Sequence, residues 1–374
     1  MDLSKPVDDG FTRALPKIEA SQARDPFLSR QLHAHLSGSI SRQCLHELWV
    51  QKKAQSPKTF TLEDPLVVMP PGKVDYSLQT FFTTFSTTIY HLLTTLSDIR
   101  AATRATLADF AADGVVYLEL RTIPRASPAQ SFTREEYLTA VLETIAEFST
   151  GKGTQMTTNL ILAIDRGTMT AREAMEVVEL AIKYRPGRGV VVGLDICGNP
   201  TKGNIALYAP AIAAAKAAGL GVTVHFAEIS ASIHPRNQEE ELRTLLNFEP
   251  DRLGHVIHVS EPIKKEIQRQ ECALELCLSC NVHAGMVEGG FAEHHFGEWW
   301  ADKNGCVVVL CTDDVGFFCS PVSNEYRLAA EHFHLCRADV LRLCRQSYGA
   351  IFGSTEEKQR LRRLLDDFAA NYKD

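Results

Sequence analysis

Eight short apolar runs set the strongest limit on how this 374-residue chain can fold, and each of them ends in polar residues. The runs are Leu32–Leu36, Val115–Arg121, Asn159–Asp165, Val190–Asp195, Gly221–Glu228, Arg252–His258, Ala273–Ser279 and Val307–Asp314. Helix-length segments fill the gaps between them. Alternating strands and helices predict parallel strands joined by crossover helices, and eight such units predict an α/β fold closed as a (β/α)8 TIM barrel.

The composition suits such a barrel and argues against several kinds of partner. A hydrophobic fraction of 45% can fill the core, and a net charge of −7 offers no basic surface for nucleic acid or an anionic membrane. No run approaches the roughly 18 apolar residues that a membrane span needs. We therefore expect a cytoplasmic protein that binds no nucleic acid polymer and no membrane, while a single nucleotide stays possible as a substrate. We also expect the protein to be a monomer.

The ten cysteines are scattered without regular spacing, which predicts reduced thiols rather than a disulfide framework. Cys277 and Cys280 do form a CxxC pair, but no second CxxC completes a Cys₄ zinc site. We interpret these two cysteines as small core residues.

The chain shows no internal repeat and no low-complexity linker, so we expect residues 1–374 to form one barrel domain. Its first βα connection, residues 38–114, is the longest. It contains the Pro-rich stretch Ser56–Gly72 and then the helical-looking segment Ser77–Ala112. Long βα loops commonly cover the mouth of a barrel site, so this insertion is a candidate lid, with an ordinary surface excursion as the alternative.

Three imidazoles and one carboxylate at the expected strand ends suggest a metal site. His33 and His35 are two residues apart in a strand and therefore point to the same face. This pair alone is a weak signal, but His225 and Asp313 stand at the ends of two other runs. The set suits Zn²⁺, and a catalytic zinc also needs room for water. We predict one Zn²⁺ per chain on these four residues.

Further polar residues lie beside the predicted metal ligands. Glu228 follows His225 by three residues, and burial next to apolar walls would raise its pKa and suit it to donate a proton. His255 ends the next strand and is placed to act on the attacking water, while Asp314 would point toward substrate. Each residue alone fits a structural role better; together they are hard to explain that way, because they gather at one barrel face.

Six segments resemble the motifs of the adenosine deaminase family, in the same order and over nearly the whole chain: LHAHLSGSI, GVVYLELRTIPR, VVGLDICG, HFAEI, DRLGHVIH and LCTDD. The Thr-x-Pro-Arg element at Thr122–Arg125, the Gly-Ser-Ile after the His pair and the element His294–Gly297 resemble the adenosine deaminase-like branch, the N6-methyl-AMP deaminases. The resemblance implies zinc-dependent hydrolytic deamination at purine C6, with N6-methyl-AMP and water giving IMP and methylamine.

The resemblance also implies roles for individual residues. Catalytic roles fall to Glu228, which would protonate purine N1, to His255, which would orient and help activate the water, and to the ligand Asp313. Asp314 would hydrogen-bond N7, and the backbone N–H of Gly198 would meet N3. The full set of implied substrate-binding residues is His35, Ser37, His91, Thr122, Ile123, Pro124, Arg125, Asp165, Gly198 and Asp314.

The expected phosphate contacts depart from the branch pattern. Ile123 stands where the branch usually has a hydroxyl residue, Ser37 where Asn is frequent, and the spacing around His91 differs. Arg125 with Thr122 can bind a 5′-phosphate. A structural ion pair of Arg121 or Arg125 is the alternative.

A further departure lies in the N-terminal segment, residues 1–31. In the family, Leu-Pro-Lys-Ile-Glu runs straight into the His-x-His strand, but here Ala20–Gln31 stands between them. Its Asp-Pro and mixed polarity predict a loop. It is either a tolerated loop at the bottom of the barrel or a stretch foreign to the functional protein. If it disturbs the first strand, it also disturbs the placement of both His ligands.

Three other functions compete with the deamination of N6-methyl-AMP. One is an adenosine deaminase acting on free adenosine. A zinc hydrolase of an amide or phosphoester is disfavoured, because no Lys stands at a strand end to bridge two metals. A catalytically weak purine-binding barrel is disfavoured, because none of the proposed ligands or acids is missing.

Overall fold

Eight parallel strands form one sheet in chain order in the computed structural model, which describes residues 2–14, 29–127, 132–151, 156–187, 189–230, 238–302 and 305–372. The strands are β1 Ser29–His35, β2 Val115–Thr122, β3 Thr157–Asp165, β4 Val191–Cys197, β5 Gly221–Phe226, β6 Arg252–His255, β7 Ala273–Leu276 and β8 Val308–Leu310. A parallel bridge between Ala34 and Asp313 joins the two ends of the sheet. The predicted (β/α)8 barrel is therefore confirmed, and the bridge brings two candidate ligand segments together.

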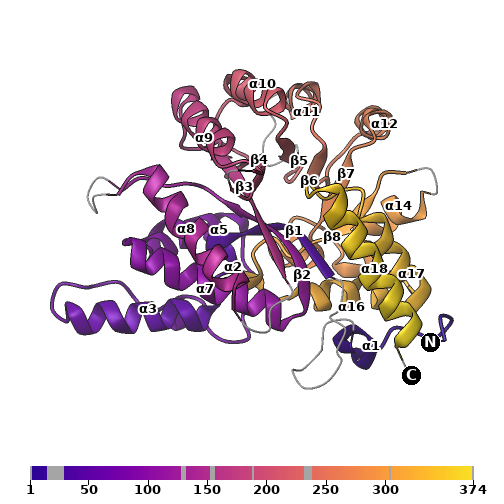
Figure 1. Ribbon diagram of the computed structural model, residues 1–374, viewed down its shortest axis with the longest axis horizontal. Helices are drawn as coiled ribbons and strands as arrows, with labels where there is room; N and C mark the ends of the chain where they lie inside the picture. Colours follow the sequence, from indigo (N-terminus) through magenta and orange to yellow (C-terminus); the bar gives the residue numbers. More distant parts are fainter. Residues whose placement is uncertain are drawn as a thin grey trace.

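Helices surround the strands, as Figure 1 shows. They are α1 Asp9–Ala14, α2 Leu36–Ser39, α3 Arg42–Gln55, α4 Pro65–Val68, α5 Leu78–Thr84, α6 Tyr90–Leu92, α7 Leu96–Ala112, α8 Arg134–Ser149, α9 Ala171–Lys183, α10 Ala209–Ala217, α11 Gln238–Asn247, α12 Glu261–Gln270, α13 Leu278–His283, α14 Phe296–Ala301, α15 Val315–Phe318, α16 Val322–His332, α17 Arg337–Gln346 and α18 Thr355–Asn371. Short turns of other helix types are η1 Phe85–Ile89, η3 Ile205–Tyr208 and η4 Phe291–Glu293. No helix in the described ranges is long and apolar enough to cross a membrane.

The outer helices follow from local sequence signals. In α9, Thr170 caps the first turn and Glu173 bonds back to the Thr170 backbone N–H, so the pair forms a capping box. Ala174, Val177 and Val178 of the same helix are then buried along one face. This combination fixes both where the helix starts and which side packs on the sheet.

The long connection between β1 and β2 is less regular than its sequence suggests. The segment Ser77–Ala112 is not one helix, because the π-helical turn η1 follows α5 and a second break precedes α7. Thr95 caps α7 through a capping box with Asp98, which explains why a new helix starts there. Earlier in the connection, Phe81 and Phe85 pack on Phe317, which follows β8 in the sequence. The ring centroid of Phe317 lies 4.9 Å from that of Phe81 and 6.0 Å from that of Phe85. The connection is therefore held against the C-terminal end of the barrel.

The first strand starts earlier than the loop predicted for Ala20–Gln31 allows. Ser29–Gln31 already belong to β1, so the loop prediction is wrong for these three residues, while Ala20–Leu28 lie outside the described residues. The pairing of β1 with β2 has register shifts after Ser29 and after Gln31. The strand nevertheless reaches the barrel end with His33 and His35 in place.

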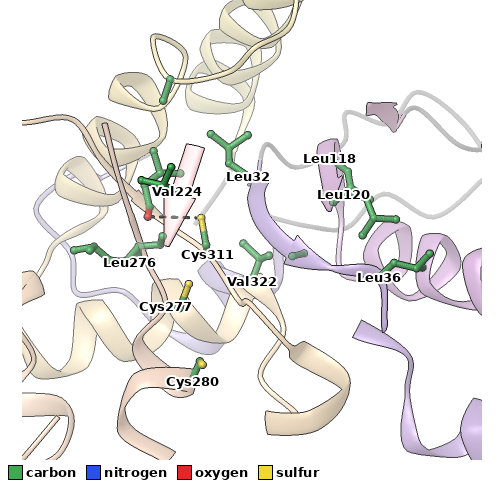
Figure 2. Packing of buried hydrophobic residues seen from close by; sticks show 14 of the residues in the cluster. Leu32, Leu36, Leu118, Leu120, Val224, Leu276, Cys277, Cys280, Cys311 and Val322 are labelled. Atoms are coloured by element: carbon green, nitrogen blue, oxygen red, sulfur yellow. Dashed lines mark hydrogen bonds between the residues drawn. The ribbon is translucent and has the colours of Figure 1, made fainter. Parts of the chain in front are cut away.

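All ten cysteines are free thiols, as the sequence predicts. Cys277, Cys280 and Cys311 are buried members of the hydrophobic cluster, of which Figure 2 shows a part with several leucine and valine side chains. The interpretation of the CxxC pair as core residues is consistent with this packing.

Candidate functional site

Four side chains converge at the C-terminal ends of β1, β5 and β8. His35 Nε2 lies 3.1 Å from His225 Nε2, and His33 Nε2 lies 3.2 Å from both His225 Nε2 and Asp313 Oδ1. One possible ligand atom from each of the four residues falls within 4.8 Å of every other. The structure thus brings together all four residues that the sequence suggests as metal ligands.

The chemistry of this group fits a divalent metal such as zinc. Three imidazole nitrogens and one carboxylate are typical zinc ligands. Asp313 Oδ1 is buried and has no hydrogen-bond partner in the described part of the chain, and a buried carboxylate oxygen left in this state would be costly without a cation. Although burial by itself raises its pKa, the imidazole of His33 holds the pKa of Asp313 well below its usual range, so the oxygen is an anionic ligand.

The Nδ1 atoms of His33 and His225, which face away from the group, each contact a carboxylate. His33 Nδ1 is 2.9 Å from Glu275 Oε2, and His225 Nδ1 is 3.2 Å from Asp195 Oδ1. A carboxylate on Nδ1 keeps the proton there and leaves Nε2 free for a metal. Arg121 contacts both carboxylates, donating to Glu275 and lying 3.2 Å from Asp195 Oδ2.

Arg121 therefore has the structural ion-pair role that was the alternative to a phosphate contact. Its side chain is 0% exposed and lies inside the barrel, behind the histidines. Burial opposes charge on the carboxylates, but the guanidinium holds the pKa of Glu275 well below its usual range. Two ionised carboxylates then orient two imidazoles at once.

Glu228 and Asp314 are the protonatable groups beside the four side chains. Glu228 follows β5 and is 6% exposed, and burial raises its pKa to about 7. Burial and the adjacent Asp313 raise the pKa of Asp314 well above its usual range. Asp314 Oδ1 has no partner among the described residues. Both carboxyl groups can therefore hold a proton near neutral pH and donate it.

His255 ends β6 with a φ of 66°, in the left-handed region that residues other than glycine rarely adopt. Its Nε2 is 3.8 Å from Asp313 Oδ2 and has no hydrogen-bond partner in the described ranges. Burial lowers the pKa of His255 well below its usual value. The imidazole is therefore neutral and faces the same space as the candidate metal ligands.

A pocket of about 960 Å³ opens on this group. Its lining includes six of the residues implied as substrate contacts: His35, Ser37, Ile123, Asp165, Gly198 and Asp314. Gly198 has a φ of 96°, and a Cβ there would come within 2.3 Å of Asp165 Oδ1. A residue without a side chain is needed at this position, so its backbone can approach a flat ring closely.

The other four implied contacts do not line this pocket in the described structure. His91 is exposed on α6, and Pro124 is buried after β2. Thr122 Oγ1 pairs with Tyr137 at 2.8 Å. Arg125 donates to the Leu93 carbonyl at 3.2 Å and lies over the Tyr90 ring. Substrate-binding roles stay predictions for these four residues and for the six that line the pocket.

Several site residues escaped the sequence analysis. Phe81, Phe82, Phe85 and Tyr90 of the long connection form the apolar wall of the pocket, and only their aromatic character within the candidate lid could have pointed to them. Gly38 is required as well, because a Cβ there would come within 1.5 Å of Asp314 Oδ1.

Asp195 and Glu275 were also missed as partners of the histidines. Each is a charged residue with an apolar neighbour on both sides in the sequence, and this is a signal that sequence can show. Because buried charges need partners, such positions mark strands whose side chains meet other polar groups inside the barrel.

Comparisons with known proteins agree with this geometry. The family model described as adenosine deaminase matches residues 29–368. The chain is 33% identical over 367 residues to the human N6-methyl-AMP deaminase, covering 96% of this chain and 95% of that protein. It is 31% identical to the N6-mAMP deaminase of Arabidopsis thaliana, covering 95% and 98%.

The solved structure of Arabidopsis ADAL complexed with IMP superposes with a TM-score of 0.83 at 30% identity. The match covers 97% of this chain and 100% of that one. The family model spans all four candidate ligands together with Glu228, and both relatives match over nearly their full length. The chain therefore belongs to the adenosine deaminase family.

Proposed function

We propose that the chain hydrolyses N6-methyl-AMP to IMP and methylamine, with one Zn²⁺ bound to His33, His35, His225 and Asp313. The observation that carries the proposal is the meeting of this ligand group with two buried carboxyl groups, Glu228 and Asp314, in one pocket. The relatives named above act on N6-methyl-AMP. A purine offers ring nitrogens that such carboxyl groups can protonate or hydrogen-bond.

Each part of the site has a task in this reaction. Bound to the four side chains, Zn²⁺ would act as a Lewis acid that lowers the pKa of water and makes it a nucleophile near neutral pH. Glu228 donates its proton to purine N1 while water adds at C6, which removes the aromaticity that opposes the addition. His255 holds the attacking water against C6. The oxygen of this water gives up one proton on addition and one on collapse of the adduct; one of them restores the proton of Glu228 and the other goes to the C6 amine, which leaves as methylamine.

The purine is oriented by groups on neighbouring strands. Burial and the adjacent Asp313 raise the pKa of Asp314 well above its usual range, which favours a protonated carboxyl group that can donate a hydrogen bond to the lone pair of N7. The Gly198 backbone N–H donates a hydrogen bond to N3 at the other edge of the ring. Donors at both edges fix which ring carbon faces the nucleophile.

Two cations are candidates for the 5′-phosphate. Arg125, predicted from the sequence, has its guanidinium 4.3 Å from the Tyr90 ring centroid, and Tyr90 lines the pocket. Lys202 lines the pocket itself. Arg125→Ala and Lys202→Ala distinguish them: the substitution that removes the phosphate partner raises KM for nucleotides and leaves KM for nucleosides unchanged.

A substrate panel tests the proposal. Purified protein with zinc is given N6-methyl-AMP, AMP, N6-methyladenosine and adenosine, and release of amine is measured. We expect N6-methyl-AMP to have the highest kcat/KM. Faster turnover of adenosine would instead assign the chain to free nucleosides. Glu228→Gln is the matched control, because it should bind zinc normally and lose about 10²–10⁴-fold in kcat.

A further inference from the structure

The element His294–Gly297 has no role in the reaction as described so far, yet it is linked to His255 in two ways, once directly and once through Asn281. It joins η4 to α14, and the His294 side chain is 2% exposed. The His294 and His295 rings stack with centroids 4.2 Å apart. Two neutral imidazoles packed together behind a catalytic-site histidine call for a physical explanation.

A chain of hydrogen bonds leads from this element to the side chain of His255. The Phe296 backbone N–H donates to His294 Nδ1 at 3.0 Å, and His294 Nε2 lies 3.1 Å from Asn281 Oδ1. Asn281 Nδ2 lies 2.9 Å from His255 Nδ1. Asn281 and His255 are both 0% exposed, so water does not compete for these bonds.

The Phe296 backbone N–H determines which atom donates and which accepts in each hydrogen bond of this series. Because this group can only donate, His294 Nδ1 must offer its lone pair, and a neutral His294 then carries its proton on Nε2. Burial lowers the pKa of His294 well below its usual value, which keeps the ring neutral. Asn281 must accept with its oxygen and donate with its nitrogen, so His255 Nδ1 is the acceptor.

The orientation of the Asn281 amide has independent support. Its Nδ2 also lies 3.9 Å from Met286 Sδ, an atom that only accepts. Turning the amide over would place an oxygen against this sulfur and two donors against each other at His294. The proton of neutral His255 is therefore on Nε2, the atom that faces Asp313 at 3.8 Å without a hydrogen-bond partner among the described residues.

The second contact holds the backbone of His255. His295 Nε2 lies 2.6 Å from the His255 carbonyl oxygen, which can only accept. This carbonyl belongs to a residue with a φ of 66°, followed by Val256 with a φ of 55°. Two successive residues in the left-handed region cost free energy and need surroundings that hold them. The stacked pair thus fixes the position of His255 as well as its tautomer.

We propose that His294, acting through Asn281, is a positioning residue that holds His255 in its Nε2–H tautomer, so that His255 meets the reacting water as a hydrogen-bond donor. The inference rests on the proposed function of the site. A neutral His255 that donates through Nε2 orients the lone pairs of the attacking oxygen toward C6. It does not act as the base that removes the proton of the water.

Asn281→Asp and His294→Phe test this proposal, with His332→Phe on α16 as the matched control. His332 is a partly buried imidazole whose ring stacks on Phe291 at 5.3 Å. Asn281→Asp offers acceptors to both histidines and should reverse His255 to the Nδ1–H tautomer. Since the wrong imidazole tautomer in a catalytic triad costs about 10⁴-fold in kcat, we expect a kcat loss of at least about 100-fold. His294→Phe keeps a stacked ring and should cost about 10–100-fold, as losses of outer-shell partners do.

Readouts other than activity separate positioning from general damage. Zinc content and the Kd for IMP should match the wild-type values in both variants. ¹⁵N NMR of the histidine rings, with the His255 signals assigned by their loss in His255→Gln, should show Nε2 protonated in the wild type and Nδ1 protonated in Asn281→Asp.

A wild-type spectrum with Nδ1 of His255 protonated would overturn the proposal, and this measurement needs no variant to fold. Unchanged kcat in His294→Phe with the tautomer intact would overturn the part played by His294. If the wild type prefers adenosine, the proposed substrate fails, while the same spectra and kcat ratios still decide this inference.

Discussion

Glu325 of α16 should make the stability of the protein depend on pH, apart from any catalysis. Its side chain is 0% exposed and accepts hydrogen bonds from the Ser279 backbone N–H and from Ser320 Oγ. These bonds favour the carboxylate, but burial outweighs them and raises the pKa to about 7 from the ordinary 4.5. Replacing Glu325 with Gln keeps a group of nearly the same size that cannot ionise.

The size of the effect follows from the two pKa values. In the unfolded chain Glu325 loses its proton near pH 4.5, whereas in the folded protein it loses it near pH 7. The folded state therefore holds more protons in this window, and its stability falls as pH rises through it. At about 1.4 kcal/mol per pKa unit, the full cost above about pH 8 is about 3 kcal/mol. About 1 kcal/mol of it is already present near pH 5.5.

Denaturant unfolding at constant zinc, followed between about pH 5.5 and pH 8.5, measures this difference. We expect Glu325→Gln to gain about 2 kcal/mol relative to the wild type across the range, because all other titrations cancel in the difference. Glu179→Gln, an exposed glutamate on α9, serves as the control and should follow the wild-type curve. A difference between Glu325→Gln and wild type that stays constant with pH would refute the reasoning.

Three further changes test other parts of the structure. Arg121→Met should lower the free energy of unfolding by about 3–5 kcal/mol, because it removes a guanidinium buried between Glu275 and Asp195. Glu275 keeps Arg252 Nε at 2.7 Å, so the cost falls mainly on Asp195. Denaturant midpoints measure the change, and a stability equal to wild type would contradict the assigned ion pairs. Gly38→Ala should lower kcat/KM by displacing Asp314, whereas the control Gly349→Ala, whose Cβ would meet only an ordinary contact at 3.6 Å, should not. Deletion of Ala20–Gln31 joins Glu19 to Leu32. Zinc content should stay unchanged if that segment is a tolerated insertion. Zinc content and turnover should both rise if the segment is foreign to the working protein.

The barrel and the grouping of its ligands could be predicted because both depend on regular geometry. Side chains two apart on a strand share a face, which joins His33 to His35. Parallel strands end at the same edge of the barrel, which brings His225 and Asp313 to them. No knowledge of side-chain conformation is needed for either step.

Tautomers and partners could not be predicted, because they depend on contacts between residues far apart in the chain. Arg121 lies 74 positions before Asp195 (195 − 121), and only the closed barrel sets it between Asp195 and Glu275. The phosphate contacts expected at Thr122 and Arg125 stay predictions for the same reason: the local motif is present, and contacts with Tyr137 and Tyr90 help to set where these side chains point. A motif specifies residue types, while the packing around it decides which groups they reach.

The first strand shows how pairing can override local sequence. Ser29, Arg30 and Gln31 have little strand propensity and follow a segment that predicts a loop. Yet β2 begins at Val115 with buried backbone, and its N–H and C=O groups need partners on the β1 side. Ser29 pairs with Val115 and Gln31 with Leu118, with register shifts that absorb the poor fit. Because any three residues can supply backbone hydrogen bonds, an insertion ahead of the two histidines is compatible with a closed barrel, provided that the residues joining it to Leu32 continue the strand.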